Sequence, residues 1–355
     1  MVLYVGLDVS LEETHFCVLD PAGKRLKEGK APTDPAAVAE VLSPFKGELD
    51  RVGLEASSIA CWLAAELKEM GFPAVVVEAR QMRAALNAQR NKTDRNDARG
   101  IAEMIRLGWY RAVHVKSPDS QRLRLLLSNR RLLKRKLIDV ENHLRGTLRA
   151  FGLFMGTVSR GQFEGRVRQL LEGIGDGRND FIETMLAVRQ GMLDGYNALH
   201  RLLVRIVAQD PVCRRLMTVP GVGPITALSF KSGVDDPLRF RRSRTVGAHF
   251  GLTPRRWQSG SIDIEGHITK QGDREVRTAL CEAAASLLLR VRSWSALKAW
   301  GMRIAKRTSM MNAIVAVARK LAAILHRVWL DDADFKVGRG AKMKRRLPQL
   351  AAPAA

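Results

Sequence analysis

The sequence predicts an α/β domain, then a basic helical region, then a mainly helical C-terminal domain. Over the first 110 residues, short β-type apolar runs and amphipathic helical runs follow one another in the order β-β-β-α-β-α-β. From residue 119 to about residue 330, most apolar residues keep helical spacing instead. A chain of 355 residues is long enough for two or three domains, each with a buried core. The order of the first elements predicts a mixed five-stranded sheet flanked by helices.

Each strand and helix of the first domain is assigned to a stretch of sequence. The segment "LYVGLDVSLEETHFCVLDPAGKRLKEGKA" contains three strands, the third of them after the turn "DPAGK". Asp34 and Pro35 are the expected N-cap and first residue of a helix over "DPAAVAEVLSPF". "RVGLEAS" is the fourth strand, "SIACWLAAELKEMG" a helix closed by Gly71, and "PAVVVEA" the fifth strand. Residues 91–107 predict a further helix.

Two long helices are predicted in the basic middle region. The first covers residues 119–151 and has a packing seam with 4-3-4 spacing at Leu133, Leu137, Val140 and Leu144. Residues 152–180 are rich in glycine and predict a connector. The second helix has a similar seam at Met192, Tyr196, Leu199, Leu203 and Ile206. Two such helices either pair as an antiparallel hairpin or dimerise, and the sequence leaves both arrangements open.

The C-terminal third contains two glycine-bearing segments. "LMTVPGVGPITAL" (216–228) places Gly221 and Gly223 between two helical patterns, and a hairpin of this kind points backbone N–H groups at a phosphate. "GLTPRRWQSGSIDIEGHITKQGD" predicts a loop. His326 is expected on the surface of the last helix, and the basic, then Pro/Ala-rich tail is expected to be disordered. The predicted organisation is 1–112, 113–210 and 211–332, followed by the tail 333–355.

The charge of the chain favours a polyanionic partner. The net charge is +23 and the isoelectric point about 10.6. Residues 1–110 carry 14 basic and 16 acidic side chains, so the remaining residues carry 45 and 20, a balance of +25. This excess favours nucleic acid over a membrane, and no apolar run is long enough to span a bilayer. The four scattered cysteines indicate reduced thiols and a cytoplasmic protein without a signal peptide.

Four carboxylates form the candidate chemical site. Asp8 and Glu55 each end an apolar strand, in "VGLDVS" and "VGLEAS", where α/β sheets present functional groups. Asp94 and Asp97 are three residues apart on a predicted helix and share a face. If that helix packs across the strand ends, the four carboxylates converge, and cations are needed to offset their repulsion. Two Mg²⁺ ions would relieve it and activate a nucleophile against a phosphodiester, with Mn²⁺ as the alternative ion.

Each of these residues also has an ordinary structural explanation. An Asp at a strand end is more often a turn residue, and an Asp pair among Arg and Lys is usually a solvated, salt-bridged helix face. The combination of two strand-end carboxylates, a helical pair and a strongly basic chain is more specific than any one of them. Within that helix Lys92, Arg95 and Arg99 would hold a phosphate backbone beside the acids.

These stretches carry a family resemblance. "GLDVS", "LEAS" and "KTDRNDARGIA" resemble the N-terminal domain of the DEDD-class insertion-sequence transposases, whose RNase H-like catalytic fold is similar to the Holliday-junction resolvase RuvC. "VPGVGPITAL", "FGLTPRRWQSG" and "GHITKQGDREVR" resemble the serine-containing C-terminal domain of the same family, which includes RNA-guided "bridge" recombinases. The motifs occur at both ends of the chain in the family's order. The resemblance implies that Asp8, Glu55, Asp94 and Asp97 form a metal-binding tetrad.

The resemblance also implies a serine nucleophile in the C-terminal domain. "RRWQSGSIDIEGH" offers Ser259 and Ser261, and Ser259 fits the family's "SG" position better. The family commonly has two serines before that glycine and a second glycine after it, whereas this chain has Gln258 before and Ser261 after. The residues expected to clamp the nucleic acid here are Arg255, Arg256, Lys270 and Arg274. Without the resemblance, "QSGS" is a flexible polar loop, and Trp257 either stacks on a base or packs against the protein.

The function expected from these features is that of a DNA transposase with a metal site and a serine nucleophile. The resemblance implies a homo-oligomer, a dimer or tetramer, acting on element ends and target DNA, and for part of the family a structured guide RNA. One alternative is a RuvC-like junction resolvase or nuclease without serine chemistry. Another is a non-catalytic nucleic-acid-binding protein that keeps a relic acidic site.

Overall fold

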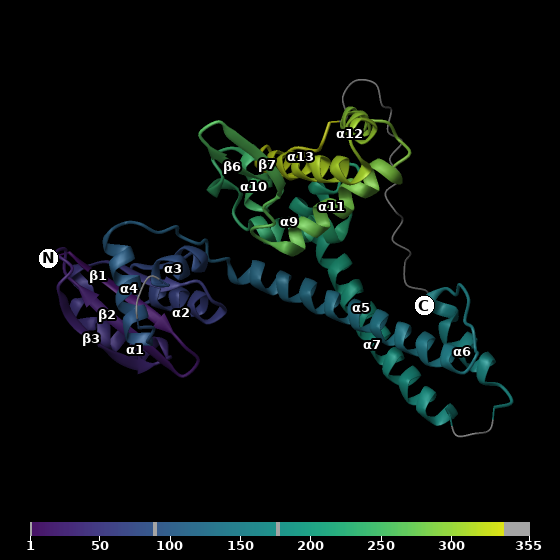
Figure 1. Ribbon diagram of the computed structural model, residues 1–355, viewed down its shortest axis with the longest axis horizontal. Coiled ribbons are helices and arrows are strands. Elements are labelled where there is room, and N and C mark those ends of the chain that lie inside the picture. Colours follow the sequence, from purple (N-terminus) through teal and green to yellow (C-terminus); the bar gives the residue numbers. More distant parts are fainter. Residues whose placement is uncertain (1, 88–90, 175–177, 337–355) are drawn as a thin grey trace. The chain divides into compact units, whose positions relative to one another are not determined.

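The structure is a computed structural model that describes residues 2–87, 91–174 and 178–336 (Figure 1). The chain forms two compact units, Met1–Lys116 and Ser117–Ala355. The first contains the mixed sheet and the second the long helices and the C-terminal helical domain. The tail predicted to be disordered lies, from residue 337 onward, outside the described residues.

The first unit contains the predicted mixed five-stranded sheet. Its strands are β1 (Leu3–Val9), β2 (Glu13–Leu19), β3 (Arg25–Pro32), β4 (Leu49–Glu55) and β5 (Ala74–Val77). They lie in the order β3-β2-β1-β4-β5. β1 pairs antiparallel with β2 and parallel with β4, and β4 pairs parallel with β5. The fold class predicted for this part of the chain is therefore confirmed.

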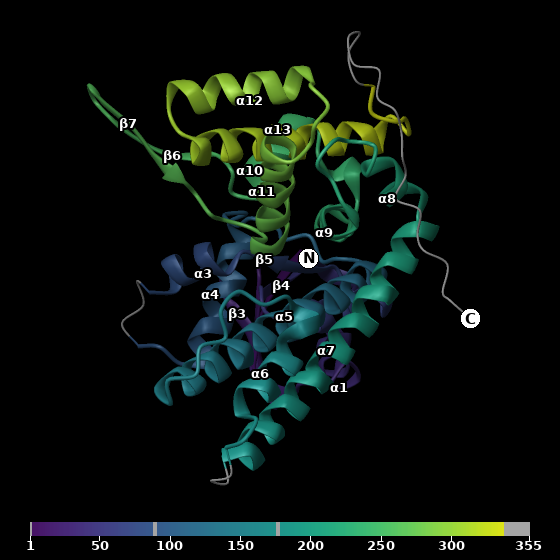
Figure 2. The same cartoon turned by 90° about the vertical axis from the view of Figure 1, so that its right-hand side faces the viewer.

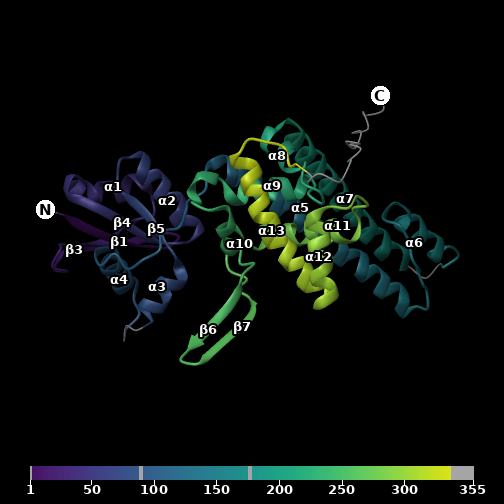
Figure 3. The ribbon, with the colours of Figure 1, turned by 90° about the horizontal axis from the view of Figure 1, so that it is seen from above.

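Helices cover both faces of this sheet (Figure 3). They are α1 (Pro35–Leu42), the 3₁₀ turn η1 (Ser43–Glu48), α2 (Ser58–Glu69), α3 (Ala79–Leu86) and α4 (Asp94–Arg106). Asp34 caps α1 as predicted, because its side chain accepts a hydrogen bond from the Ala37 N–H at 3.0 Å. α3 was not predicted, since Met82 is its only buried residue and gives no periodic signal. The helix predicted at 91–107 begins at Asp94, and residues 88–90 lie outside the described part.

α4 lies directly against the sheet because two glycines leave room for it. Gly6 of β1 and Gly53 of β4 are paired neighbours on the same face. A Cβ atom on Gly6 would overlap the Ala98 carbonyl oxygen, and one on Gly53 would overlap the Ile105 side chain. The alternate residues Leu3, Val5 and Leu7 pack on the other face, in the core that contains α1 and α2 residues.

The second unit begins with two long helices, α5 (Pro118–Ala150) and α7 (Arg178–Gln209), which run side by side in Figure 1. They are antiparallel, because Arg130 near the start of α5 contacts Tyr196 late in α7, at 2.6 Å, while Glu141 contacts the earlier Arg189 at 2.9 Å. Arg189 is buried, and its guanidinium also lies 4.6 Å from the centre of the Phe163 ring. Of the two arrangements left open by the sequence, the structure contains the hairpin within the chain.

The connector predicted at 152–180 contains helical structure, which corrects that prediction. It includes a 3₁₀ turn, η2 (Arg160–Gln162), and helix α6 (Phe163–Leu171). The apolar residues Phe163, Val167 and Leu171 are buried against Leu144 and Leu148 of α5. The glycines around this short helix hid the four-residue spacing of these apolar side chains. Residues 175–177 lie outside the described part.

The C-terminal part of the second unit is mainly helical, as predicted. Its helices are α8 (Pro211–Leu216), α9 (Pro224–Val234), α10 (Val246–His249), α11 (Arg274–Leu289), α12 (Ala296–Arg307) and α13 (Met310–Leu330), with the 3₁₀ turns η3 (Pro237–Arg239) and η4 (Ser243–Thr245). His326 is fully buried in α13, with ring nitrogens 2.9 Å from Ser243 Oγ and 2.8 Å from the Pro237 carbonyl oxygen. The expectation that His326 lies on the surface was therefore wrong, because two polar partners distant in sequence satisfy its ring.

The segment predicted as a loop between α10 and α11 is a β-hairpin. Its strands are β6 (Pro254–Ser259) and β7 (Ile262–Ile268), and they project from the helical core of this unit (Figure 2). The alternation of apolar and polar residues after Gly260 and Ser261, in "IDIE", is the signal of a strand following a two-residue turn that the loop prediction overlooked. Among the described residues, no helix is long and apolar enough to cross a membrane.

Candidate active site: carboxylates where α4 crosses the sheet

Asp8 and Glu55 lie side by side on the face of the sheet that α4 covers. Leu7 of β1 and Leu54 of β4 are paired in register, so the next residue on each parallel strand is Asp8 or Glu55. Both lie two residues beyond the glycine pair Gly6 and Gly53, and side chains two apart in a strand share a face. The sequence placed each carboxylate at the end of a strand, and the sheet register adds that the two strands are neighbours.

Asp94 and Asp97 are brought to the same place by the first turn of α4. Thr93 caps the helix by accepting a hydrogen bond from the Asn96 N–H at 3.2 Å. Ala98, the residue after Asp97, is the one packed over Gly6, so Asp97 lies beside the end of β1. Asp97 is only 8% exposed, and its Oδ1 atom is buried without a hydrogen-bond partner. Asp94 remains exposed at the helix start.

Burial and acidic neighbours raise the pKa values of two of the four carboxyl groups, Asp8 and Glu55. The pKa of Asp8 is raised to about 6. Burial is the largest cause, and the charges of Asp94, Asp97 and Glu55 contribute in the same direction. Burial also raises the pKa of Glu55; nearby Arg83 and Lys92 oppose that shift, whereas Asp97 adds to it. The region therefore has an excess of negative charge, although the chain as a whole is strongly basic.

His15 and Glu28 belong to this region and were missed by the sequence reasoning. His15 lies opposite Asp8 in the β1–β2 ladder, and its Nε2 atom is 3.9 Å from Asp94 Oδ2. Glu28 of β3 forms an ion pair with Arg95 of α4, which ties the helix start to the sheet edge. The three-residue turn between β1 and β2 could have placed His15, since hairpin register follows from turn length.

The carboxylate oxygens of this site are not already arranged as a set of metal ligands. Among the side chains of the described residues, no three His, Cys, Asp or Glu groups are close enough to hold a metal ion together. The donor chemistry nevertheless fits a hard divalent cation, because all four candidate ligands are carboxylates and Mg²⁺ prefers oxygen. The buried Asp97 Oδ1 atom has no hydrogen-bond donor, and three acidic neighbours add to the effect of burial on the pKa of Asp8, so a cation bound here would be favourable.

Ser259 lies in the second unit, as the last residue of β6. It pairs with Ile262 across the turn formed by Gly260 and Ser261, and both serines are exposed. On the same hairpin Trp257 pairs with Ile264 and lies over Gly266, where a Cβ atom would come within 2.5 Å of its ring. The apolar residues Trp257, Ile262 and Ile264 are all more than half exposed.

The basic and glycine residues predicted to bind nucleic acid have different surroundings. Arg256 is paired with Asp263 at 2.7 Å and Arg255 donates to the Thr269 carbonyl at 3.4 Å. Gly221 lies against α11, where a Cβ atom would meet the Ala283 carbonyl oxygen. The remaining members of the set are at or near the surface: Lys92, Arg95, which pairs with Glu28, Arg99, Gly223, Lys270 and Arg274. Gly223, the N-cap of α9, borders open space and is the better placed of the two glycines to approach a ligand.

Comparison with known proteins places these features in one family. Residues 5–152 match a DEDD transposase model of the IS110 type, and residues 213–301 match the model described as "Transposase IS116/IS110/IS902 family". The transposase for insertion sequence element IS1111A of Coxiella burnetii is 28% identical over 339 residues, covering 94% of this chain and 91% of that protein. A probable family 20 transposase of Pseudomonas aeruginosa is 28% identical over 307 residues, covering 81% and 86%.

A solved structure also aligns with the first part of the chain. Thermus thermophilus RuvC, in complex with a Holliday junction substrate, is 16% identical with a TM-score of 0.26, covering 32% of this chain and all of that chain. The two family models together cover more than half of the chain; the first extends from the first unit past the end of α5, and the second lies within the second unit. The chain belongs to the IS110/IS116/IS902 family of insertion-sequence transposases.

Proposed function

We propose that this transposase cuts and rejoins DNA strands with a metal-assisted carboxylate site and a serine nucleophile. The observation that carries the proposal is the excess of negative charge where α4 crosses the sheet, with a buried Asp97 oxygen that has no donor. A surface salt-bridged helix would not leave an acidic oxygen buried and unpaired, because such burial costs folding free energy. A bound cation offsets that cost.

Asp8, Glu55, Asp94 and Asp97 are the residues that would hold Mg²⁺ or Mn²⁺. Divalent cations at such a site supply Lewis acidity and charge neutralisation for phosphodiester chemistry. The protein's role is to position the carboxylates. The glycine pair lets α4 pack against the sheet, and Glu28 forms an ion pair with Arg95 in the first turn of α4. Lys92 lies close enough to Glu55 to lower the pKa of that carboxyl group, so it would also bring positive charge to a phosphate bound beside the carboxylates.

The proposed nucleophile is Ser259. Its exposed Oγ attacks the phosphorus, an Oγ–P bond forms and the bond from phosphorus to a deoxyribose oxygen breaks. The serine proton is lost to solvent, and the leaving deoxyribose oxygen takes up a proton from solvent to become a free hydroxyl. The DNA hydroxyl of the rejoined strand later displaces Ser259 and restores the phosphodiester, so the sequence of steps needs no external energy source. The position of Ser259 at the tip of an exposed hairpin supports this role, because a hydroxyl there can approach a strand.

The proposal is tested by comparing matched variants in strand-cleavage and transposition assays. Asp97→Asn is expected to abolish cleavage while retaining DNA binding, because it keeps the side-chain shape and removes the charge. Asp50→Asn, a surface carboxylate of the same unit, is the control and should leave both unchanged. Unchanged transposition in the Asp97→Asn variant would show that the metal mechanism is wrong and would favour a non-catalytic binding protein.

Serine chemistry is tested separately with a denaturing gel that traps covalent protein–DNA adducts. Ser259→Ala is expected to eliminate the adduct, whereas Ser261→Ala keeps it. Cleavage that persists in Ser259→Ala would instead favour a RuvC-like nuclease that uses the carboxylates alone. Loss of the adduct only in Ser261→Ala would assign the nucleophile to Ser261.

We also propose that the chain works as a homo-oligomer, a dimer or tetramer, with a structured guide RNA, as the family resemblance implies. The strongly basic, exposed side chains along α5 support a polyanionic partner. Light scattering of the purified protein before and after ribonuclease treatment measures both properties. A monomer whose mass is unaffected by ribonuclease and by added element RNA contradicts this part of the proposal.

A further inference from the structure

An exposed tryptophan is held rigidly just after α4. The helix ends at Arg106 with Leu107 as its C-cap, and the Gly108 N–H and Trp109 N–H donate to the carbonyls of Ile105 and Met104, each at 3.1 Å. These two hydrogen bonds form a Schellman motif. The motif needs a left-handed residue at the position of Gly108, where φ is 66°. The Trp109 carbonyl in turn accepts a hydrogen bond from Gln81 Nε2 at 3.1 Å. The backbone of Trp109 is thus fixed from both sides.

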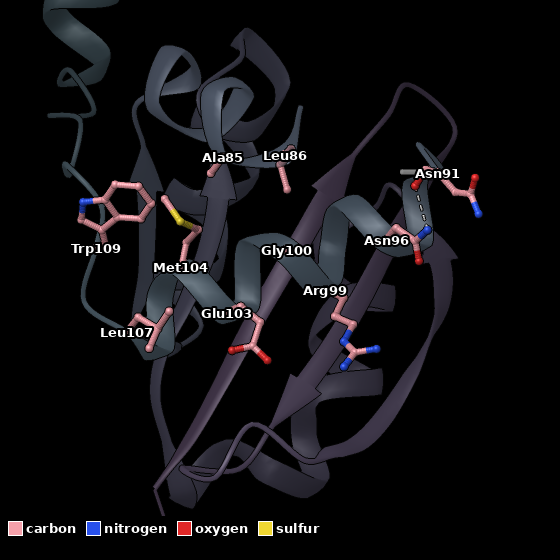
Figure 4. Close-up of a pocket in the computed structure, with 10 residues that line it drawn as sticks. All are labelled: Ala85, Leu86, Asn91, Asn96, Arg99, Gly100, Glu103, Met104, Leu107 and Trp109. Atoms are coloured by element: carbon pink, nitrogen blue, oxygen red, sulfur yellow. Dashed lines mark hydrogen bonds between the residues drawn. The ribbon is translucent and has the colours of Figure 1, made fainter. Parts of the chain in front are cut away.

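The indole of Trp109 is nevertheless 64% exposed. It forms one end of a pocket of about 570 Å³ between α3 and α4 (Figure 4). A volume of this size lies within the range of small-ligand sites. A large aromatic ring on a fixed backbone loses little conformational entropy when another flat ring stacks on it, because its position is already determined.

The two ends of the pocket differ in chemistry. Apolar side chains gather at the tryptophan end: Ala85, Leu86, Met104, Leu107 and Trp109. Asn91, Asn96 and Arg99 lie toward the start of α4, and Figure 4 shows them at the opposite end from Trp109. Glu103 also lines the pocket, but its carboxylate is paired with Arg106 at 2.8 Å. The pocket therefore combines an aromatic surface, amide groups and a cation.

This pocket is on the outer side of α4, away from the carboxylate site. The buried residues of the helix, including Asp97, Ala98 and Ile101, face the sheet. Asn96, Gly100, Glu103 and Leu107 follow the helical spacing along the other side. From Asn96 to Leu107 the helix rises about 16 Å, which is several times the spacing of nucleotides in one strand of a duplex.

We propose that this pocket binds an unpaired nucleobase of a nucleic-acid strand, stacked on Trp109, with the adjoining phosphate at Arg99. The inference rests on the proposed function, which supplies nucleic acid as the ligand. Amide side chains offer both donors and acceptors to a base edge, and a flat aromatic ring accepts any base. An acidic or purely apolar ligand is a poorer match, because the pocket holds a cation and two amides beside its apolar end.

The direct test uses the wild-type chain, so that no variant needs to fold. Short single strands carrying 5-iodouracil, one set of DNA and one of RNA, are irradiated with the protein, and the crosslinked peptides are identified by mass spectrometry. The expected result is a crosslink at Trp109 from at least one set, and the more efficient set identifies the strand that occupies the pocket. Crosslinks confined to other peptides in both sets would overturn the proposal.

Affinity measurements with matched variants separate stacking from general binding. Trp109→Ala is expected to weaken single-strand binding on the order of tenfold, while Trp109→Phe stays close to wild type. Trp62→Ala is the control, because Trp62 of α2 is also exposed, at 45%, and does not line the pocket. All three variants should bind duplex DNA as the wild type does.

The outcomes distinguish this inference from the proposed function. Unchanged single-strand affinity in Trp109→Ala, with normal duplex binding and cleavage, overturns the base pocket and leaves the transposase function intact. A change in oligomer mass without a change in single-strand affinity assigns the surface to a second copy of the chain and also overturns it. If the wild type binds neither duplex nor single strands, the proposed function itself fails.

Discussion

Asp8 and Asp97 differ from ordinary surface acids in what surrounds them. Asp97 has a buried oxygen without a donor, and the pKa of Asp8 is raised to about 6 by burial and by its acidic neighbours. By comparison, the exposed Glu13 has a lowered pKa because Lys30 donates to it at 2.8 Å. The charged form of a carboxyl group is therefore disfavoured at Asp8 and favoured at Glu13, and this contrast marks the site.

The raised pKa of Asp8 has a consequence for stability. A carboxyl whose folded-state pKa lies above its ordinary value of 3.8 favours the folded state when it is protonated. That contribution is fully present below about pH 4 and is lost as the pH rises through about 6. Asp8→Asn should therefore increase the free energy of unfolding at pH 8 by on the order of 1 kcal/mol, because the partly exposed group is screened, and so raise the melting temperature. At pH 4 the substitution should have little effect.

Thermal melts without divalent ions measure this effect. Glu13→Gln is the control of opposite sign and should not raise the melting temperature at pH 8. Added Mg²⁺ is expected to stabilise the wild type more than Asp8→Asn, since the variant lacks one proposed ligand. A melting difference between Asp8→Asn and wild type that is the same at pH 4 and pH 8 would contradict the electrostatic explanation.

Among the elements, α4 depends on a close approach to the sheet, and the β6–β7 hairpin depends on its turn. Gly6 and Gly53 have no side chain between the sheet and the helix, so the first turn of α4 reaches the ends of β1 and β4. The hairpin that carries Ser259 is exposed on both strands and has little packing of its own. The acidic side chains of α4 are thus held by close packing against the sheet, whereas Ser259 lies on an exposed hairpin.

The close packing of α4 against Gly6 predicts that adding one methyl group at this glycine has a large effect on stability. Gly6→Ala would put a methyl group against the backbone of Ala98 and Ala102, and it should destabilise the fold by about 1–3 kcal/mol, as overpacked cores do. Gly47→Ala, with nothing within 4 Å of its added Cβ atom, should stay within about 0.5 kcal/mol of wild type. Chemical denaturation measures both free energies of unfolding.

Strand cleavage should fall further in Gly6→Ala than its loss of stability explains, because α4 carries Asp94 and Asp97. The assay is run at a temperature where the variant remains folded by circular dichroism. Full cleavage activity in a folded Gly6→Ala protein would show that the position of α4 does not set the reaction geometry.

On the scale of the whole molecule, the carboxylate site and the excess of positive charge lie in different parts of the chain. Residues 1–110 are close to neutral, and the excess of basic side chains lies in the rest. The acidic site can therefore exist in a protein of net charge +23 without being neutralised by a uniform basic surface. Electrostatic attraction of nucleic acid is expected mainly from the second unit.

This separation predicts how DNA affinity depends on salt. Replacing the exposed Lys134 and Arg135 of α5 by Gln should lower the slope of log affinity against log salt by about 2, if each contacts one phosphate. Asp97→Asn should leave the slope unchanged. Fluorescence anisotropy over a series of salt concentrations measures both, and equal slopes for the double variant and wild type would exclude this part of α5 from the DNA contact.

Much of the fold could be predicted because its signals are local. The strand runs, the Asp34 cap, the Gly71 helix end and the two long helical seams each depend on residues close in sequence, and the structure agrees with them. The incorrect predictions also have causes in the local sequence. α3 buries one side chain, α6 is masked by glycines, and the hairpin was obscured by its polar turn.

The sequence by itself determined the mixed sheet, the helical second part, the charge separation and the four carboxylates as candidates. Only the tertiary structure decided that Asp8 and Glu55 are neighbours in register, that the first turn of α4 joins them, and that His15 and Glu28 belong there. It also decided that Trp109 is exposed beside a pocket while His326 is buried. The physical reason is that periodicity and caps act over a few residues, whereas burial and charge coupling depend on which distant segments pack together.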